Sequence, residues 1–205
     1  MPKQGKKRIK KRIRRIIHSQ LTDEEKDGIW KAAAEAIVSN DKDKLDSFLK
    51  AYPDVVDHQY GKDTLLHIAT INRQFKCVKL LLKYGSDVNA VNETSTTPLI
   101  ISTRDKDIPI SKLLLEYKAK VNVKTDSGST PLHYASRNLD GNLELVQLLL
   151  ESLPKSKLKR VVNACIESCP YHSVLDYVQI QEIRAYLISM GYFSFHIFKK
   201  ITFTL

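Results

Sequence analysis

The hydrophobic residues of this chain fall into pairs of short segments with helical spacing. In the first segment of each pair, a Leu is followed three positions later by Ala or Ser. These residues are Leu66 and Ala69, Leu99 and Ser102, and Leu132 and Ala135. The second segment carries a leucine triplet, at residues 80–82, 113–115 and 148–150. This pattern predicts two amphipathic helices per pair, and the small residues let the helices approach closely.

The pairs recur with a period of 33 residues, which is fixed by Thr64, Thr97 and Thr130. The segments that begin there read Thr-Leu-Leu-His-Ile-Ala, Thr-Pro-Leu-Ile-Ile-Ser and Thr-Pro-Leu-His-Tyr-Ala. Thr followed by Pro favours a helix start, because the hydroxyl caps free N–H groups and Pro at the first helical position loses no hydrogen bond. The polar segments 90–96 and 123–129 predict extended, hairpin-like connectors. Gly85 is expected to end a helix, and Gly128 to lie at a connector turn.

A helix–turn–helix unit with a projecting hairpin every 33 residues and a Thr-Pro-Leu-His-x-Ala signature resembles the ankyrin repeat. The resemblance is specific over residues 61–150 and covers about 28–190. It implies an all-α solenoid of about five units that binds another protein and catalyses no reaction. The chain departs from the family pattern at several positions. These are Leu65 in place of Pro, Ser95 in place of a connector glycine, Ile100 in place of His, Pro109 early in a second helix, and two extra residues within 139–142.

Residues 21–191 are predicted to form the solenoid, with degenerate outer units. The expected units are 28–60, 61–93, 94–127, 128–170 and 171–191. Residues 22–25 read as a capping box before a helix. The residues expected on the inner side of that helix are Ile29, Ala33, Ala36 and Ile37. Terminal units need such changes because one of their faces meets solvent instead of a neighbour.

The excess of positive charge is concentrated at the N-terminus, ahead of the predicted repeats. The chain has 33 Lys and Arg against 23 Asp and Glu, a formal net charge of +10. Residues 1–17 hold nine of the basic residues and no acid, which leaves 24 basic and 23 acidic residues in 18–205. This near-neutral body disfavours a general nucleic-acid-binding surface. Residues 1–20 are interpreted as a separate basic tail or helix, with three alternative roles: localisation or nucleic-acid contact, binding to an anionic membrane, or no role beyond solubility or extending the cap.

Residues 192–205 form an apolar C-terminal tail. Four of the six phenylalanines lie here, at Phe193, Phe195, Phe198 and Phe203. We expect the tail to fold over the open end of the last unit. The alternative is an exposed patch that binds a partner or a membrane.

Two histidines and one cysteine pair are candidates for chemistry. His67 and His133 occupy the same position of two units, where ankyrin-like imidazoles tie a connector to a helix by hydrogen bonds, and we expect that role here. Cys165, Cys169 and His172 have a spacing that could serve zinc, but no fourth ligand is apparent, so core packing is favoured. No nucleophile–base arrangement or glycine-rich phosphate loop stands out. The sequence therefore predicts no enzyme activity, no metal and no cofactor.

Function is expected on the concave side, where connector tips and first-helix faces align across units. The predicted partner-binding residues on the connectors are Tyr60, Asp63, Glu93, Thr94, Thr96, Asp126, Ser127 and Ser129. Those on the helices are Asn72, Arg104, Asp105, Arg137 and Asn138. The expected partner is a protein bound by a monomer, and a nucleic acid or an anionic membrane would be bound only through residues 1–17.

Cysteine content indicates where such a protein works. Three cysteines are an odd and sparse set that suits a reducing intracellular compartment, the cytoplasm or the nucleus. Two alternative functions remain open. One is an adaptor tethered through the basic N-terminus, and the other is a microbial effector acting in the host cytosol, because small degenerate ankyrin proteins are similar to such effectors.

Overall fold

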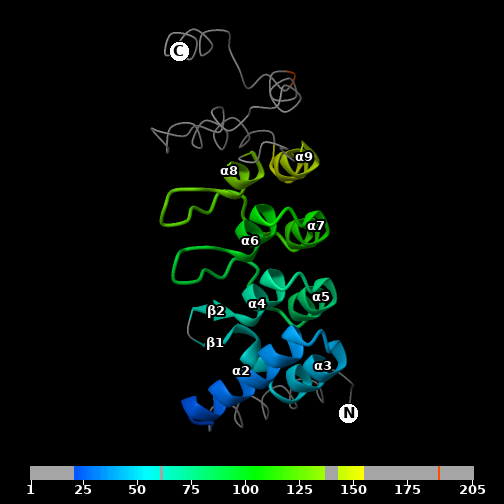
Figure 1. Cartoon of the computed structure of the whole chain (residues 1–205), viewed down its shortest axis with the longest axis vertical. Coiled ribbons are helices and arrows are strands. Elements are labelled where there is room, and N and C mark those ends of the chain that lie inside the picture. Colours follow the sequence, from blue (N-terminus) through cyan, green and yellow to red (C-terminus); the bar gives the residue numbers. More distant parts are fainter. Residues whose placement is uncertain (1–20, 61, 137–142, 155–188, 190–205) are drawn as a thin grey trace, which may run out of the picture.

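The described part of the chain folds into stacked pairs of short helices, as the hydrophobic pattern predicts (Figure 1). The computed structural model describes residues 21–60, 62–136, 143–154 and 189. The first helices of the pairs are α2 (Asp23–Val38), α4 (Leu65–Ile71), α6 (Pro98–Arg104) and α8 (Pro131–Ser136). The second helices are α3 (Lys42–Ala51), α5 (Phe75–Lys83), α7 (Ile108–Glu116) and α9 (Leu143–Glu151). A short 3₁₀ helix, η1 (Pro53–Asp57), follows α3. The architecture is an all-α solenoid, which confirms the predicted fold class.

The helices start where the sequence places capping residues. At α2, Thr22 Oγ1 accepts from Glu25 N at 3.2 Å and Thr22 N donates to Glu25 Oε2 at 2.8 Å, which completes the predicted capping box. Asp107 caps α7 by accepting from Ile110 N at 3.0 Å. Pro109 is therefore the second residue of α7, where a backbone N–H would have no helical partner, and this departure from the repeat pattern costs nothing.

The connectors between pairs are closed by backbone hydrogen bonds. In the first, β1 (Gln59–Tyr60) pairs antiparallel with β2 (Asp63–Thr64). The next two close without assigned strands: Asn92 N donates to Thr96 O at 3.1 Å, and Thr125 N donates to Ser129 O at 2.9 Å. The hairpin-like connectors that the sequence predicts are thus present, although only the first has a strand ladder.

The period of 33 residues also appears in the backbone, at positions with positive φ. Gly85 and Gly128 have φ of 92° and 80°, as expected from the sequence. Their equivalents in the neighbouring units, Lys118 and Ser95, adopt the same left-handed conformation without being glycine. A third set lies in the turn between the two helices of a unit and comprises Asn40, Arg73 and Lys106. The sequence did not reveal this set, because none of its three side chains marks a left-handed residue as clearly as glycine does.

The core runs continuously between the two helix layers. The paired Leu and small residues that begin the pattern are all buried, from Leu66 to Ala135. Ser102 is buried in a position where other units have Ala, and its hydroxyl donates to Leu99 O at 3.1 Å and accepts from Ser111 Oγ at 2.8 Å. In α2, Trp30 is buried while the predicted inward residue Ile29 is only half-buried against the core. No helix within the described ranges is long and apolar enough to cross a membrane.

Substitution of two glycines by alanine is expected to change the free energy of unfolding in opposite directions, which tests the backbone conformations described above. Gly28 lies within α2 and Gly85 has left-handed φ, and a Cβ at either position would have no atom within 4 Å. We expect Gly28→Ala to raise the free energy of unfolding by about 0.5–1 kcal/mol through helix propensity. Gly85→Ala should lower it by about 1 kcal/mol, because a left-handed Ala is strained. Urea unfolding followed by circular dichroism measures both, and shifts of the same sign would contradict the backbone assignment.

Candidate functional site

The connectors and the first helices meet at an angle along one side of the molecule, opposite the second helices (Figure 1). We call this surface the concave face, and it comprises the connector residues 58–60, 62–64, 90–96 and 123–129 with the exposed ends of α2, α4 and α6. Each first helix is covered by its own second helix and by the first helices of neighbouring units. The exposed positions of α4 and α6 therefore lie away from first helices on both sides, whereas α2 has such a neighbour on one side only.

Buried histidine holds the connectors in place. His67 Nδ1 accepts from Thr64 N at 3.2 Å and lies 2.8 Å from Thr64 Oγ1 at the start of α4. On the other side of the ring, Nε2 lies 3.0 Å from the carbonyl oxygen of Thr96 in the next connector, so Nε2 carries the proton. Burial lowers the pKa of His67 below its usual value, which keeps the ring neutral. At α8, His133 repeats the first half of this geometry, since Nδ1 accepts from Thr130 N at 3.1 Å. The predicted structural role is confirmed for His67, and for His133 the described residues show the bond to the start of its own helix.

Neighbouring connectors are tied to each other at their tips. Asn92 Nδ2 donates to Asp63 Oδ1 at 3.0 Å, and Lys62 pairs with Glu93 at 3.4 Å. Asp126 N donates to Thr94 O at 3.3 Å, which links the next two connectors. These bonds fix the spacing of the tips, so the carboxylates of Asp63 and Glu93 stabilise the connector array itself.

At the helix ends, side chains form a row across the units. Val38, Ile71 and Arg104 are spaced 33 residues apart at the ends of α2, α4 and α6. Val38 is 60% exposed and Ile71 is 43% exposed, so the row joins two apolar side chains to one cation. Arg104 Nε bonds to Asp105 Oδ1 at 2.9 Å. Sequence reasoning found Arg104 and missed the two apolar members, although their spacing from Arg104 was a signal that could have identified them.

The next residues along the chain support this row. Arg73, the second residue after α4, donates a guanidinium N–H to Asp105 O at 2.8 Å and so links two units. Asn72 is exposed, and its amide donates to Ile68 O of its own helix at 2.8 Å. The structural role of Arg73 was also missed, because its left-handed backbone is not visible in the sequence.

The structure places the remaining predicted residues differently. Thr94, Asp126 and Ser127 are exposed on the connectors, and Ser129 is half-buried. The expected exposure of Thr96 is wrong: it is 9% exposed, because its backbone bonds to His67 and Asn92 draw it under the connector. The side chains of Tyr60, Arg137 and Asn138 lie outside the described residues.

Three further sequence predictions also fall outside the described residues. They concern the basic segment 1–17, the possible zinc ligands Cys165, Cys169 and His172, and the tail 192–205. Within the part of the chain that the structure describes, no group of three His, Cys, Asp or Glu side chains could hold a metal ion.

Comparison with protein families identifies the family to which this architecture belongs. A family model described as ankyrin repeats, in three copies, matches residues 30–125 and 66–160. The chain belongs to the ankyrin repeat family. Ankyrin repeats are generally protein–protein interaction modules, and the family is typically non-catalytic. A comparison with curated proteins finds no match for this chain.

His67 predicts a pH dependence of stability. The unfolded pKa is near 6.5 and the folded pKa is lower, so the unfolded chain binds the proton first as pH falls. The free energy of unfolding should be complete above about pH 6.5 and decrease below it until the folded pKa is reached. Protonation would also place a hydrogen on Nδ1, facing Thr64 N. Urea unfolding at a series of pH values measures this effect.

The matched variant is His67→Ile, since Ile100 occupies the equivalent position in the next unit. It should lower the free energy of unfolding by about 1–3 kcal/mol at neutral pH, because Thr64 N and Thr96 O lose their partner. It should also flatten the pH dependence below 6.5. An unchanged pH dependence would show that His67 does not titrate between the two states.

Proposed function

We propose that this ankyrin repeat protein is a non-catalytic binding module that holds a protein partner against its concave face. The observation that carries the proposal is the preorganised array of connectors, tied by the His67–Thr96, Asn92–Asp63 and Asp126–Thr94 hydrogen bonds. A surface that is ordered before binding loses little conformational freedom when a partner docks. Such a surface supports recognition rather than chemistry, because its polar groups are engaged with one another.

The exposed row at the helix ends indicates what the partner presents. Val38 and Ile71 offer apolar contact, and the terminal amino groups of the Arg104 guanidinium have no partner among the described residues. A guanidinium binds a carboxylate through two parallel hydrogen bonds, and this geometry makes Arg a frequent anchor in interfaces. The proposed partner therefore places an aliphatic or aromatic side chain over Ile71 and a carboxylate beside Arg104.

A reducing intracellular compartment is part of the same proposal. Cys77 on α5 carries a free thiol that is fully buried in the hydrophobic core. Burial raises the pKa of the Cys77 thiol, which keeps it protonated and unreactive. The core thus contains a cysteine that packs as a small apolar side chain, in keeping with a protein that does not use disulfides to hold its repeats together.

Substitutions at Ile71 and Arg104 test whether the partner binds to the concave face. Ile71→Ala with Arg104→Ala should reduce partner affinity at least about ten-fold, because it removes the apolar contact and the carboxylate anchor together. Partners captured from lysate by the full chain are identified by mass spectrometry, and the affinity of the most enriched one is then measured by titration. Circular dichroism should show unchanged helix content.

The matched control is Lys112→Ala with Glu116→Ala on α7, which alters two exposed residues of a second helix. This control should bind like the native chain. Equal loss in both double variants, or no loss in the first, would refute binding at the concave face.

A further inference from the structure

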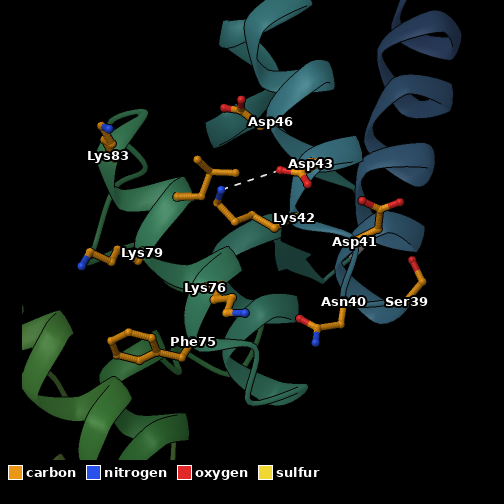
Figure 2. A pocket seen from close by; sticks show the side chains of 11 residues that line it. Ser39, Asn40, Asp41, Lys42, Asp43, Asp46, Phe75, Lys76, Lys79 and Lys83 are labelled. Carbon is orange, nitrogen blue, oxygen red and sulfur yellow. Dashed lines mark ion pairs between the residues drawn. The ribbon is translucent and has the colours of Figure 1, made fainter.

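A second hollow surface lies away from the concave face, between the second helices α3 and α5. Its volume is about 1070 Å³, and residues from the start of α3 and from the outward side of α5 line it. Figure 2 shows aspartates from the α3 side, with lysines and an aromatic ring along α5. The concave face shares none of these side chains, so the hollow is a separate surface.

Three unpaired lysines follow the α5 side of the hollow. Lys76, Lys79 and Lys83 are spaced three and four residues apart, which puts them on one face of the helix. All three are exposed. None of their ammonium groups forms an ion pair with a carboxylate of the described residues, and the acids that line the hollow with them come from the start of α3 (Figure 2). Like charges at this spacing repel one another and weaken the helix slightly. The charges of this row therefore do not stabilise the helix.

The acids across the hollow already have partners. Asp41 caps α3 by accepting from Lys44 N at 2.9 Å, and Asp43 lies 3.8 Å from Lys42 Nζ. Asp46 accepts from Lys50 and from the Tyr84 hydroxyl, and these bonds lower the pKa of its carboxyl group. Because each of these carboxylates already has a partner, on α3 or in the Tyr84 hydroxyl at the end of α5, none of them pairs with the three α5 lysines.

The repeat itself shows that lysines are not required at these positions. One unit later, the equivalent residues of α7 are Pro109, Lys112 and Glu116. One unit earlier, those of α3 are Asp43, Asp46 and Lys50. The same place in the fold thus accepts acid, base or proline, and the concentration of three lysines is particular to α5.

Beside the lysine row is an apolar contact surface. Phe75 begins α5 and is 40% exposed, and Leu80 also lines the hollow. Figure 2 places the Phe75 ring at one end of the row, past Lys76 and Lys79. An aromatic ring next to several cations can anchor one apolar side chain while the cations bind nearby carboxylates.

We propose that the hollow between α3 and α5 binds an acidic peptide segment of another protein. The segment sets two or three carboxylates against Lys76, Lys79 and Lys83, and an aromatic or aliphatic side chain against Phe75. A nucleic acid fits less well, because a continuous polyanion would also meet Asp41, Asp43 and Asp46 along the opposite side. The partner bound here can differ from the one on the concave face, so both surfaces could be occupied together.

Fluorescence anisotropy with the full chain tests the proposal. The probe is a fluorescein-labelled pool of ten-residue peptides, each with four Asp or Glu and one Phe, and the reference pool has Asn and Gln in place of the acids. The native chain should bind the acidic pool and not the reference pool, more weakly as salt increases. Lys76→Gln with Lys79→Gln and Lys83→Gln should weaken binding about ten-fold, and Phe75→Ala about three-fold.

A control variant separates this surface from general basicity. Lys112→Gln with Lys120→Gln and Lys124→Gln removes the same charge from exposed positions elsewhere and should leave binding unchanged. Carbodiimide coupling and mass spectrometry should then place peptide carboxylates on the three α5 lysines. Three results would overturn the proposal: no binding of the acidic pool, equal loss in both triple variants, or coupling confined to residues 1–17. Tighter binding of a labelled oligothymidine than of the peptides, lost in the α5 variant, would also overturn it in favour of a nucleic acid. The concave-face variants do not touch this hollow, so either proposal can fail alone.

Discussion

None of the described helix pairs is large enough to bury its own apolar face, so each depends on the pair stacked beside it. Helices of six to ten residues, such as α4, α6 and α8, are too short to be stable by themselves. Stacking converts their faces into one continuous core, which runs from Trp30 to Leu150 through the described residues. Buried small residues, Ala69 and Ser102 among them, allow the close approach that this stacking needs.

Stacking alone would leave the connectors free to vary in angle, and buried hydrogen bonds prevent this. His67 bonds at once to the start of its own helix and to the next connector, and it is fully buried while doing so. A neutral imidazole suits this position because one nitrogen accepts and the other donates. The third unit has Ile100 instead, so its connector relies on Thr125 and on the bond from Asp126 N to Thr94 O. The histidine therefore acts as a structural element of the scaffold, and it is also the residue from which we expect a pH dependence of stability.

The two proposed binding surfaces differ in how the repeat produces them. On the concave face, equivalent positions of successive units line up as the row Val38, Ile71 and Arg104. Several units therefore contribute to one surface. In the hollow, a single helix interrupts the repeat with three lysines while its neighbours carry other charges. The fold determines only the residues of the core, so the residues of both surfaces are free to vary. The side chains of these two surfaces therefore distinguish this chain from a generic solenoid.

Sequence alone determined the period, the helix pairs, the capping residues and the inward faces, because each depends on residues close together in the chain. Leu66 with Ala69, the Thr22 box and Gly85 are local signals of this kind, and the structure agrees with all of them. Only the tertiary structure decided which polar residues are available to a partner. Thr96 and Asp63 looked as free as Asp126, yet the first is buried and the second bonds to Asn92, since both meet residues about 30 positions away. Exposure of Ile71, the left-handed Arg73 and the unpaired state of the α5 lysines likewise depend on how units stack, and no local pattern records that stacking.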